Sequence, residues 1–308
     1  MSKIKWIIGL FLLISTFIFP AVVHAETQNP GLTPGEPPKS ERTLEDSDAS
    51  LRASEHRVLS GDNILNNLFE RPFTAIEMVY QPELDIQTVD FAVLDQFFYF
   101  TITLKGMDLA GSALYGIEFD RSKTGRGDLI VLSKVPGKKW SMDNITVMTD
   151  QNGDVGGINP IIADEDFKGN GYDTQIEIGK DKVAFSRISP DDPHAVQIAV
   201  SLALLDNPME FLYGAWVDNG LKKFSMFDYN DYQGPSEAGS PFKDNEDYPI
   251  KGLFSLDNTC RLPFGFSQES STVPGTCINI APAVAGGCNR YCVQRCAANQ
   301  GCCVWGCR

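Results

Sequence analysis

Short runs of aromatic and β-branched residues, separated by turns rich in Gly, Asp and Asn, are the feature that most restricts the fold of this chain of 308 residues. The clearest run, FFYFTITL at 97–104, places Phe98, Phe100, Ile102 and Leu104 on one face, because successive side chains of a strand point to opposite faces. No long helical pattern alternates with these runs, which argues against a parallel α/β sheet. The pattern predicts a mostly antiparallel β-sandwich.

Several other segments carry the same strand signal. The stretch Val196–Leu205 also suits a helix, because Ala199, Ala203 and Leu205 break strict alternation. A short helix through Leu68, capped by Asp62 or Asn63, is expected before the strands begin. The remaining expected strands are Leu114–Phe119, Asp128–Ser133, Ile145–Thr149, Thr174–Ile178, Lys182–Arg187, Val196–Leu202 and Phe211–Val217.

The amino terminus has the pattern of a signal peptide. Lys3 and Lys5 precede an apolar run at 7–19, and Val23-His24-Ala25 offers a small-residue cleavage site. The run is shorter than the ~20 residues needed to span a bilayer. We therefore expect cleavage after Ala25, no transmembrane segment in the mature chain, and a secreted or cell-surface location. The next segment, 26–56, is rich in proline and acidic residues and is predicted to be a disordered spacer.

The charge of the chain excludes one class of partner. Forty acidic residues against 26 basic residues give a net charge of −14. Because proteins that bind nucleic acid need a basic face to neutralise phosphates, we expect no nucleic-acid partner. The sequence also contains no nucleophile-elbow, HExxH or Walker motif.

Six of the eight cysteines fall at the carboxyl end. The i, i+4, i+8 spacing of Cys288, Cys292 and Cys296 would put them on one face of a short helix, and the chain would then turn back. Export favours a small disulfide-stapled hairpin over a metal or iron–sulfur site, because thiols oxidise outside the cytosol. Cys260 and Cys277 most simply pair with each other. The full set of expected disulfide cysteines is Cys260, Cys277, Cys288, Cys292, Cys296, Cys302, Cys303 and Cys307.

The order of three phrases resembles the opening of DOMON-like and family-9 carbohydrate-binding modules. These are QPELDI at 81–86, FFYFTITLKG at 97–106 and YGIEFDRSKTGRGDLIV at 115–131. The phrases TDQNGDVGG, DYNDYQGPSEAGSP and YPIKGLFSLDNTCR are similar to uncharacterised exported bacterial proteins. The resemblance implies a β-sandwich that binds sugars or, in some DOMON members, haem. The Met/His ligand pair of haem has no clear match, and no binding residue is carried over.

Acidic turns predict a calcium ion. Asp150, Asn152 and Asp154 stand at alternate positions of one loop, and hard cations such as Ca²⁺ gather such oxygens. Asp120 and Asp128 could supply ligands from a neighbouring loop. No glutamate stands at the twelfth position from Asp150, so an EF-hand is excluded. The alternative for each loop is an ordinary turn, since Asp and Asn side chains hydrogen-bond their own backbone.

Aromatic side chains offer a second kind of ligand contact. Tyr229 and Tyr232 lie in a polar segment, and Trp140 follows two lysines. Because aromatic rings stack on the apolar face of a sugar, these three are the candidate ligand-binding residues.

Two carboxylate pairs allow an enzymatic alternative. A glycoside hydrolase needs two carboxyl groups at a fixed separation, and the candidates are Glu118 with Asp120, or Asp218 with Asp228.

The sequence thus predicts an exported, non-catalytic module for carbohydrate or another cell-surface polymer, with calcium-stabilised loops. The alternatives are a two-carboxylate glycoside hydrolase and a structural envelope protein assembled through its Cys-rich tail. The expected regions are a signal peptide (1–25), a linker (26–56), a sandwich (57–277), a connector (278–287) and a Cys-rich module (288–308).

Overall fold

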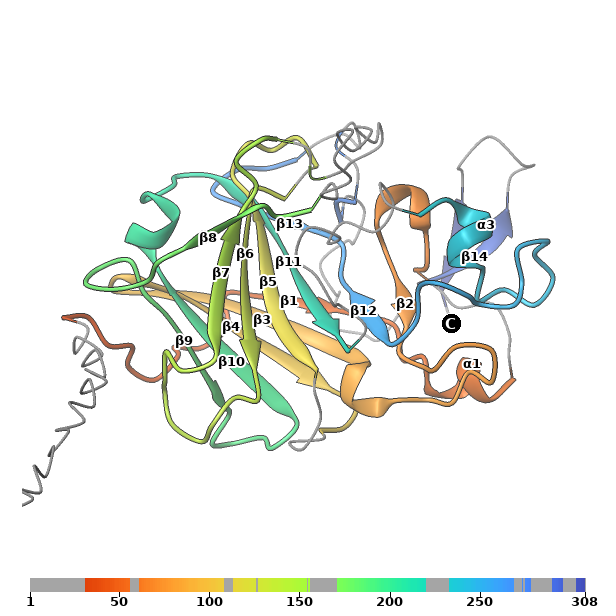
Figure 1. Cartoon of the computed structure of the whole chain (residues 1–308), viewed down its shortest axis with the longest axis horizontal. Coiled ribbons are helices and arrows are strands. Elements are labelled where there is room, and N and C mark those ends of the chain that lie inside the picture. The colour runs from red at the N-terminus through yellow and green to blue at the C-terminus, as the bar shows by residue number, and fades with distance from the viewer. Residues whose placement is uncertain are drawn as a thin grey trace, which may run out of the picture.

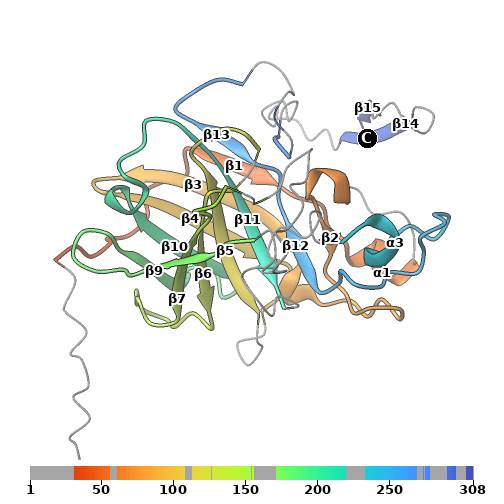
Figure 2. The same ribbon diagram turned by 45° about the horizontal axis from the view of Figure 1, so that its top comes forward.

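The computed structural model confirms the antiparallel β-sandwich: two sheets, of five and of eight strands, lie in two layers (Figures 1 and 2). The residues that the structure describes are 31–55, 61–107, 113–125, 127–153, 155, 171–219, 233–268, 273 and 275–277, with the backbone of 290–295 and 303–307.

All pairings of the five-stranded sheet are antiparallel. Its central pair, β3 and β4, forms a hairpin, because Asp95 at φ 53° allows a tight turn between them. The strands in spatial order are β1 (Arg42–Glu45), β3 (Ile86–Leu94), β4 (Phe97–Leu104), β10 (Ala195–Ser201) and β9 (Ala184–Ile188).

The eight-stranded sheet is also antiparallel, and its long central strands β11 and β5 pair along seven residues. A short strand, β13 (Leu262–Phe264), pairs with β11 beside the main path. The other strands in spatial order are β2 (Glu70–Arg71), β12 (Leu256–Asn258), β11 (Phe211–Asp218), β5 (Leu114–Asp120), β6 (Leu129–Lys134), β7 (Ile145–Thr149) and β8 (Thr174–Ile176).

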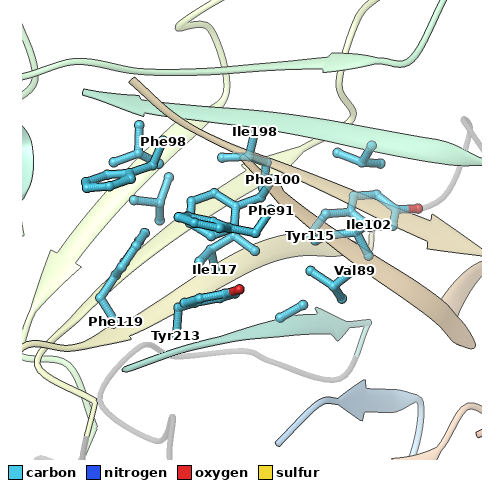
Figure 3. Close-up of a cluster of buried hydrophobic side chains, with 14 of the residues drawn as sticks. Val89, Phe91, Phe98, Phe100, Ile102, Tyr115, Ile117, Phe119, Ile198 and Tyr213 are labelled. Atoms are coloured by element: carbon cyan, nitrogen blue, oxygen red, sulfur yellow. The ribbon is translucent and has the colours of Figure 1, made fainter. Parts of the chain in front are cut away.

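The main core lies between the sheets and is rich in aromatic rings (Figure 3). Phe91 stacks on Tyr213 at 4.8 Å between ring centroids, and Phe100 meets Phe119 edge to face at 5.6 Å. Four side chains that the sequence predicts on one face of β4 all belong to this core: Phe98, Phe100, Ile102 and Leu104. Burial of such rings is the main contribution to the stability of the sandwich.

Both sheets are also covered on their outer faces. Ile130, Leu132 and Trp216 belong to a cluster outside the eight-stranded sheet, while Phe97 and Phe185 belong to one outside the five-stranded sheet. This double burial explains why β6 is an uninterrupted apolar run (LIVLS) rather than an alternating one.

Helical segments are short and lie between the strands. None of the helices in the described part of the chain is long and apolar enough to cross a membrane. The helices α1 and α3 lie at the same end of the sandwich as β2 and β12 (Figure 1). The helical elements are α1 (Ser50–Glu55), η1 (Ile64–Asn66), η2 (Pro82–Leu84), η3 (Leu202–Leu205) and α3 (Pro235–Ala238).

The expected pairing of Cys260 with Cys277 is confirmed. The small C-terminal hairpin is present as β14 (Arg290–Arg295) and β15 (Cys303–Cys307). Its first arm is a strand where the cysteine spacing predicted a helix. The pairing of the six terminal cysteines lies outside the described side chains, and the expected signal peptide lies outside the described residues.

The structure differs from the sequence prediction at two further places. Residues 42–45, within the predicted spacer, form β1 at the edge of the five-stranded sheet, where only Leu44 is buried. One buried side chain in four residues is too weak a pattern to identify a strand. The stretch 195–205 is both strand and helix, because β10 runs directly into the turn η3, which Ser201 caps by accepting a hydrogen bond from the amide of Leu204.

Candidate metal centre

Two carboxylates face each other across neighbouring strands at one end of the sandwich. Strands β2 and β12 pair so that Glu70 stands directly opposite Asp257. Glu70 is 3% exposed and Asp257 is fully buried. Like charges opposite each other on paired strands destabilise a sheet, so this register requires a compensating proton or cation.

Two more carboxylates come from the five-stranded sheet. Asp46 directly follows β1, and its amide donates to the carbonyl of Gln87 in β3. Asp85 directly precedes β3, and the amide of Ile86 next to it donates to Oδ2 of Asp257 at 2.7 Å. The site therefore lies where the edges of the two sheets meet.

The inner three carboxylates converge. Asp46, Glu70 and Asp257 each offer an oxygen within 4.8 Å of the others. One oxygen of each residue (Oδ2 of Asp46, Oε2 of Glu70 and Oδ1 of Asp257) is shielded from solvent and accepts from no amide, hydroxyl or basic group. The side chains of Asp46 and Glu70 hydrogen-bond to each other when one of the two carboxyl groups holds a proton. Because buried polar atoms are normally hydrogen-bonded, three such atoms at one place indicate a ligand site.

The nearby arginine does not neutralise the three carboxylates. Arg71 follows Glu70 in β2 and therefore points to the opposite face of the strand. There its guanidinium pairs with Asp62 at 2.8 Å and donates to the carbonyl of Leu253. Within the described residues, no basic side chain forms an ion pair with Asp46, Glu70 or Asp257.

The backbone is shaped to accept the carboxyl group of Glu70. Gly61 has φ +101°, and a Cβ there would stand 2.7 Å from Oε1 of Glu70. Only glycine meets both the torsion and the space at this position. The loop before β2 therefore packs directly against the acidic cluster.

Burial and mutual repulsion raise the pKa of every carboxyl group in the cluster. Burial raises the pKa of Asp46 to about 6. Burial, with the charges of Asp46 and Asp257, holds the pKa of Glu70 well above its usual value. The pKa of Asp257 is raised in the same way, by burial and by the charges of Asp46 and Asp85. Burial, followed by the charge of Asp48, raises the pKa of Asp85 to about 7.

Asp85 supports the site rather than opening into it. Its oxygens accept from the amide of Ala49 at 3.2 Å, the hydroxyl of Tyr80 and the side-chain amide of Gln87 at 2.8 Å. The three converging residues are thus the candidate ligands, and Asp85 adds negative charge behind them.

The donor set fits a hard divalent cation. Two oxygens bound to one calcium ion at ~2.4 Å can stand at most about 4.8 Å apart, and the three ligand oxygens all lie within 4.8 Å of one another. Carboxylates are preferred ligands of Ca²⁺ and Mg²⁺. Mg²⁺ usually retains several waters, so a site this deeply buried suits Ca²⁺ better.

The loops in which the sequence predicted calcium use their carboxylates otherwise. Asp120 accepts from the amides of Thr124 and Gly125, and Asp128 accepts from the amide and side chain of Arg121. Burial raises the pKa of Asp120. These contacts are those of ordinary turns, the alternative that the sequence left open.

The loop that begins at Asp150 follows the same pattern. Asp150 accepts from the amides of Gly153 and Val155, and the amide of Asn152 donates to Asp173 at 3.1 Å. Asp154 lies outside the described residues. Calcium binding in this loop stays a prediction.

Of the three predicted aromatic contacts, only Trp140 lies among the described residues. Tyr229 and Tyr232 lie outside them. Trp140 lies over the five-stranded sheet, and the guanidinium of Arg187 covers one face of its indole at 4.3 Å from the ring centroid. That face is closed to a sugar ring.

The first carboxylate pair of the enzymatic alternative, Glu118 with Asp120, is committed to the structure. Glu118 is 1% exposed and pairs with Arg261 at 2.6 Å. It also accepts from the hydroxyl of Tyr172 at 2.8 Å and the indole of Trp216 at 3.4 Å. With Asp120 capping a turn, neither carboxyl group is free to attack a substrate. Asp228 lies outside the described residues.

Sequence reasoning missed all three candidate ligands. Asp46 falls within the predicted spacer (26–56), and the sequence pattern gives no role to Glu70 or Asp257. One signal was available: Glu70 in LFERPF and Asp257 in LFSLDNTC are charges inside apolar stretches. Such charges are rarely buried without a partner.

The chain was compared with protein-family models, curated proteins and solved structures. No family model, no curated protein and no solved structure matches the chain. The resemblance to DOMON-like and family-9 modules therefore depends on the sequence phrases alone.

Proposed function

We propose that this protein is a non-catalytic binding module whose sandwich is locked at one end by a calcium ion bound to Asp46, Glu70 and Asp257. The observation that carries the proposal is the convergence of three carboxylates within 4.8 Å, two of them on buried residues and one on the half-buried Asp46, each with a shielded oxygen that accepts from no amide, hydroxyl or basic group. A calcium ion would give all three oxygens a partner and remove the repulsion between Glu70 and Asp257.

The position of the site explains what the ion would do. Asp46 belongs to the β1 side of the five-stranded sheet, whereas Glu70 and Asp257 belong to the eight-stranded sheet. An ion between them joins the two layers and fastens the chain directly after β1, a strand that pairs with β3 at a sheet edge. Its binding energy would become folding energy, because the unfolded chain has no such site.

Thermal unfolding of the whole protein in EDTA and in millimolar CaCl₂ tests the proposal. Calcium at a hundred times its Kd should stabilise the fold by about 2.7 kcal/mol. For a chain of this size, that raises Tm by about 5–10 °C. The same concentration of Mg²⁺ should raise Tm less, because Mg²⁺ gives up its waters reluctantly.

Two matched variants locate the effect. Asp257→Asn should remove most of the calcium-induced rise in Tm, because it deletes one ligand charge. Asp206→Asn changes an exposed carboxylate, paired with Lys182 and Arg121 at the surface, and should leave the rise unchanged. Equal Tm values for the wild type in EDTA and CaCl₂, or an equal response in both variants, would contradict the proposal.

The carbohydrate part of the sequence-based hypothesis stays a prediction. Its preferred contacts, Tyr229 and Tyr232, lie outside the described residues. Binding to a glycan array that is lost in Tyr229→Ala would support it.

A further inference from the structure

A proline-rich stretch before β1 is bound against the outer face of the five-stranded sheet. We call residues 32–38 (LTPGEPP) the strap; it contains neither helix nor strand, and it belongs to the red segment before β1 in Figure 1. Leu32 packs on the cluster that contains Phe97, Tyr99 and Phe185. Pro34 is buried. A segment of this composition is held only if the surface beneath it supplies specific contacts.

Two aromatic side chains, one from β4 and one from the loop between β6 and β7, hydrogen-bond to the backbone of the strap. The indole Nε1 of Trp140 donates to the carbonyl of Gly35 at 3.0 Å. The amide of Gly35 donates to the hydroxyl of Tyr99 at 3.1 Å. A pair of aromatic residues that hydrogen-bonds to the backbone between prolines is how aromatic-lined grooves recognise extended proline-rich peptides.

A charged contact fixes the direction of the strap. The guanidinium of Arg187 binds both carboxylate oxygens of Glu36. Arg187 is itself held by the side chain of Gln197 at 2.7 Å and lies against Trp140. The Arg187 side chain is 7% exposed, whereas that of Glu36 is 74% exposed. The sheet thus supplies a buried arginine that its neighbours hold in place, and the strap supplies an exposed glutamate.

The groove continues beyond the strap. The strap residues Pro37 and Pro38 line a depression of about 410 Å³ together with Thr101 and Gln197 of the five-stranded sheet. The strap therefore leaves part of the sheet surface beside it uncovered.

We propose that this face is a recognition groove for acidic, proline-rich peptide segments, and that the strap is its intramolecular occupant. The partner is an extended segment of another polypeptide with an apolar residue, a proline and a glutamate at the spacing of Leu32, Pro34 and Glu36. Trp140, Tyr99 and Arg187 recognise it. This site is independent of the acidic cluster, and neither proposal needs the other.

Binding of the free peptide GLTPGEPPKS (residues 31–40) to the full chain tests the groove. In the wild type the tethered strap competes at an effective concentration on the order of millimolar. A peptide with a Kd of about 10 µM would then bind about 100-fold more weakly than to an open groove. The double variant Leu32→Asp/Glu36→Lys releases the strap and leaves every groove residue in place.

The expected result is that this variant binds the peptide at least about 10-fold more tightly than the wild type, as measured by fluorescence anisotropy of labelled peptide. Peptide carrying Glu36→Lys is the matched control and should not bind. Trp140→Phe, added to the released variant, should weaken binding because it removes the donor to Gly35. A folded released variant that does not bind the peptide, or binds the control equally, would overturn the proposal.

A second arrangement does not depend on the folding of the double variant. A protease site inserted after Ser40 lets the strap be cut once the wild-type groove has formed. The severed strap should exchange with labelled peptide on dilution. A severed strap that leaves, followed by no uptake of peptide, would equally overturn the proposal.

Discussion

Two acidic sites are buried in this sandwich, and they are compensated in opposite ways. Glu118, outside the eight-stranded sheet, has an arginine, a tyrosine hydroxyl and an indole around it. The cluster of Asp46, Glu70 and Asp257 has three shielded oxygens without a donor. Among the described residues, the chain thus supplies a basic partner to the first site and none to the second.

The difference shows which buried charges belong to the fold and which point to a ligand. The backbone packs tightly against Glu118, because a Cβ at Gly127 would stand 2.2 Å from Oε1 of Glu118. Around the cluster, Gly61 is fitted in the same way to Glu70. Both sites therefore have a glycine backbone packed against a carboxyl group, but only Glu118 has a basic partner among the described residues.

The largest expected effect is the loss of the internal counter-charge. Arg261→Met should destabilise the protein by about 3–5 kcal/mol, because it leaves the carboxylate of Glu118 buried without its cation. Urea unfolding measures this loss, and it should be the same in EDTA and in CaCl₂. Adding Glu118→Leu should recover much of the stability, since a buried pair can be replaced by apolar groups at little cost. If CaCl₂ restored the stability lost in Arg261→Met, the claim that the two sites are compensated in different ways would be wrong.

The second effect is a pH dependence of stability to which Asp46 in the cluster and its neighbour Asp85 contribute. The folded-state pKa values of Asp46 and Asp85, about 6 and about 7, lie above the ordinary aspartate value. Between about pH 4 and pH 7 the folded state therefore holds protons that the unfolded state has released. In EDTA, stability should fall as pH rises through that window.

Calcium competes with these protons, so the stabilisation by calcium should grow as pH rises over the same window. With the ion in hundredfold excess over its Kd, the stabilisation should approach about 2.7 kcal/mol only near neutral pH. Tm measured in EDTA and in CaCl₂ from pH 4.5 to pH 7.5 gives the difference directly. A calcium-induced rise in Tm that is the same at every pH would show that the ion binds elsewhere.

The sandwich could be predicted because its signal is local. Phe98, Phe100 and Ile102 alternate within one strand, and Glu118 alternates with the core residues Ile117 and Phe119. Neighbouring residues carry that pattern, so no long-range contact has to be known to read it.

The cluster and the groove could not be predicted because their parts are distant in sequence. Glu70 and Asp257 meet only through the pairing of β2 with β12, two strands of two and three residues. The strap has the composition of a disordered linker, and the residues that hold it, such as Tyr99, Trp140 and Arg187, are all distant from it in sequence. Composition describes what a segment can do alone, not what a folded surface does to it.

The smallest expected effect has the opposite sign to the first. In EDTA, Asp257→Asn should stabilise the protein by about 1 kcal/mol, because it removes a like charge opposite Glu70 and can place an amide donor where Oδ1 has no partner. The side-chain oxygen of the asparagine can still accept from the amide of Ile86. Urea unfolding in EDTA measures the change, with Asp206→Asn as the exposed control, expected to cost less than about 1 kcal/mol. Asp257→Asn would then be more stable than the wild type without calcium and less stable with it, a crossing that a purely structural aspartate cannot produce. Destabilisation in both conditions would instead make Asp257 a counterpart of Glu118.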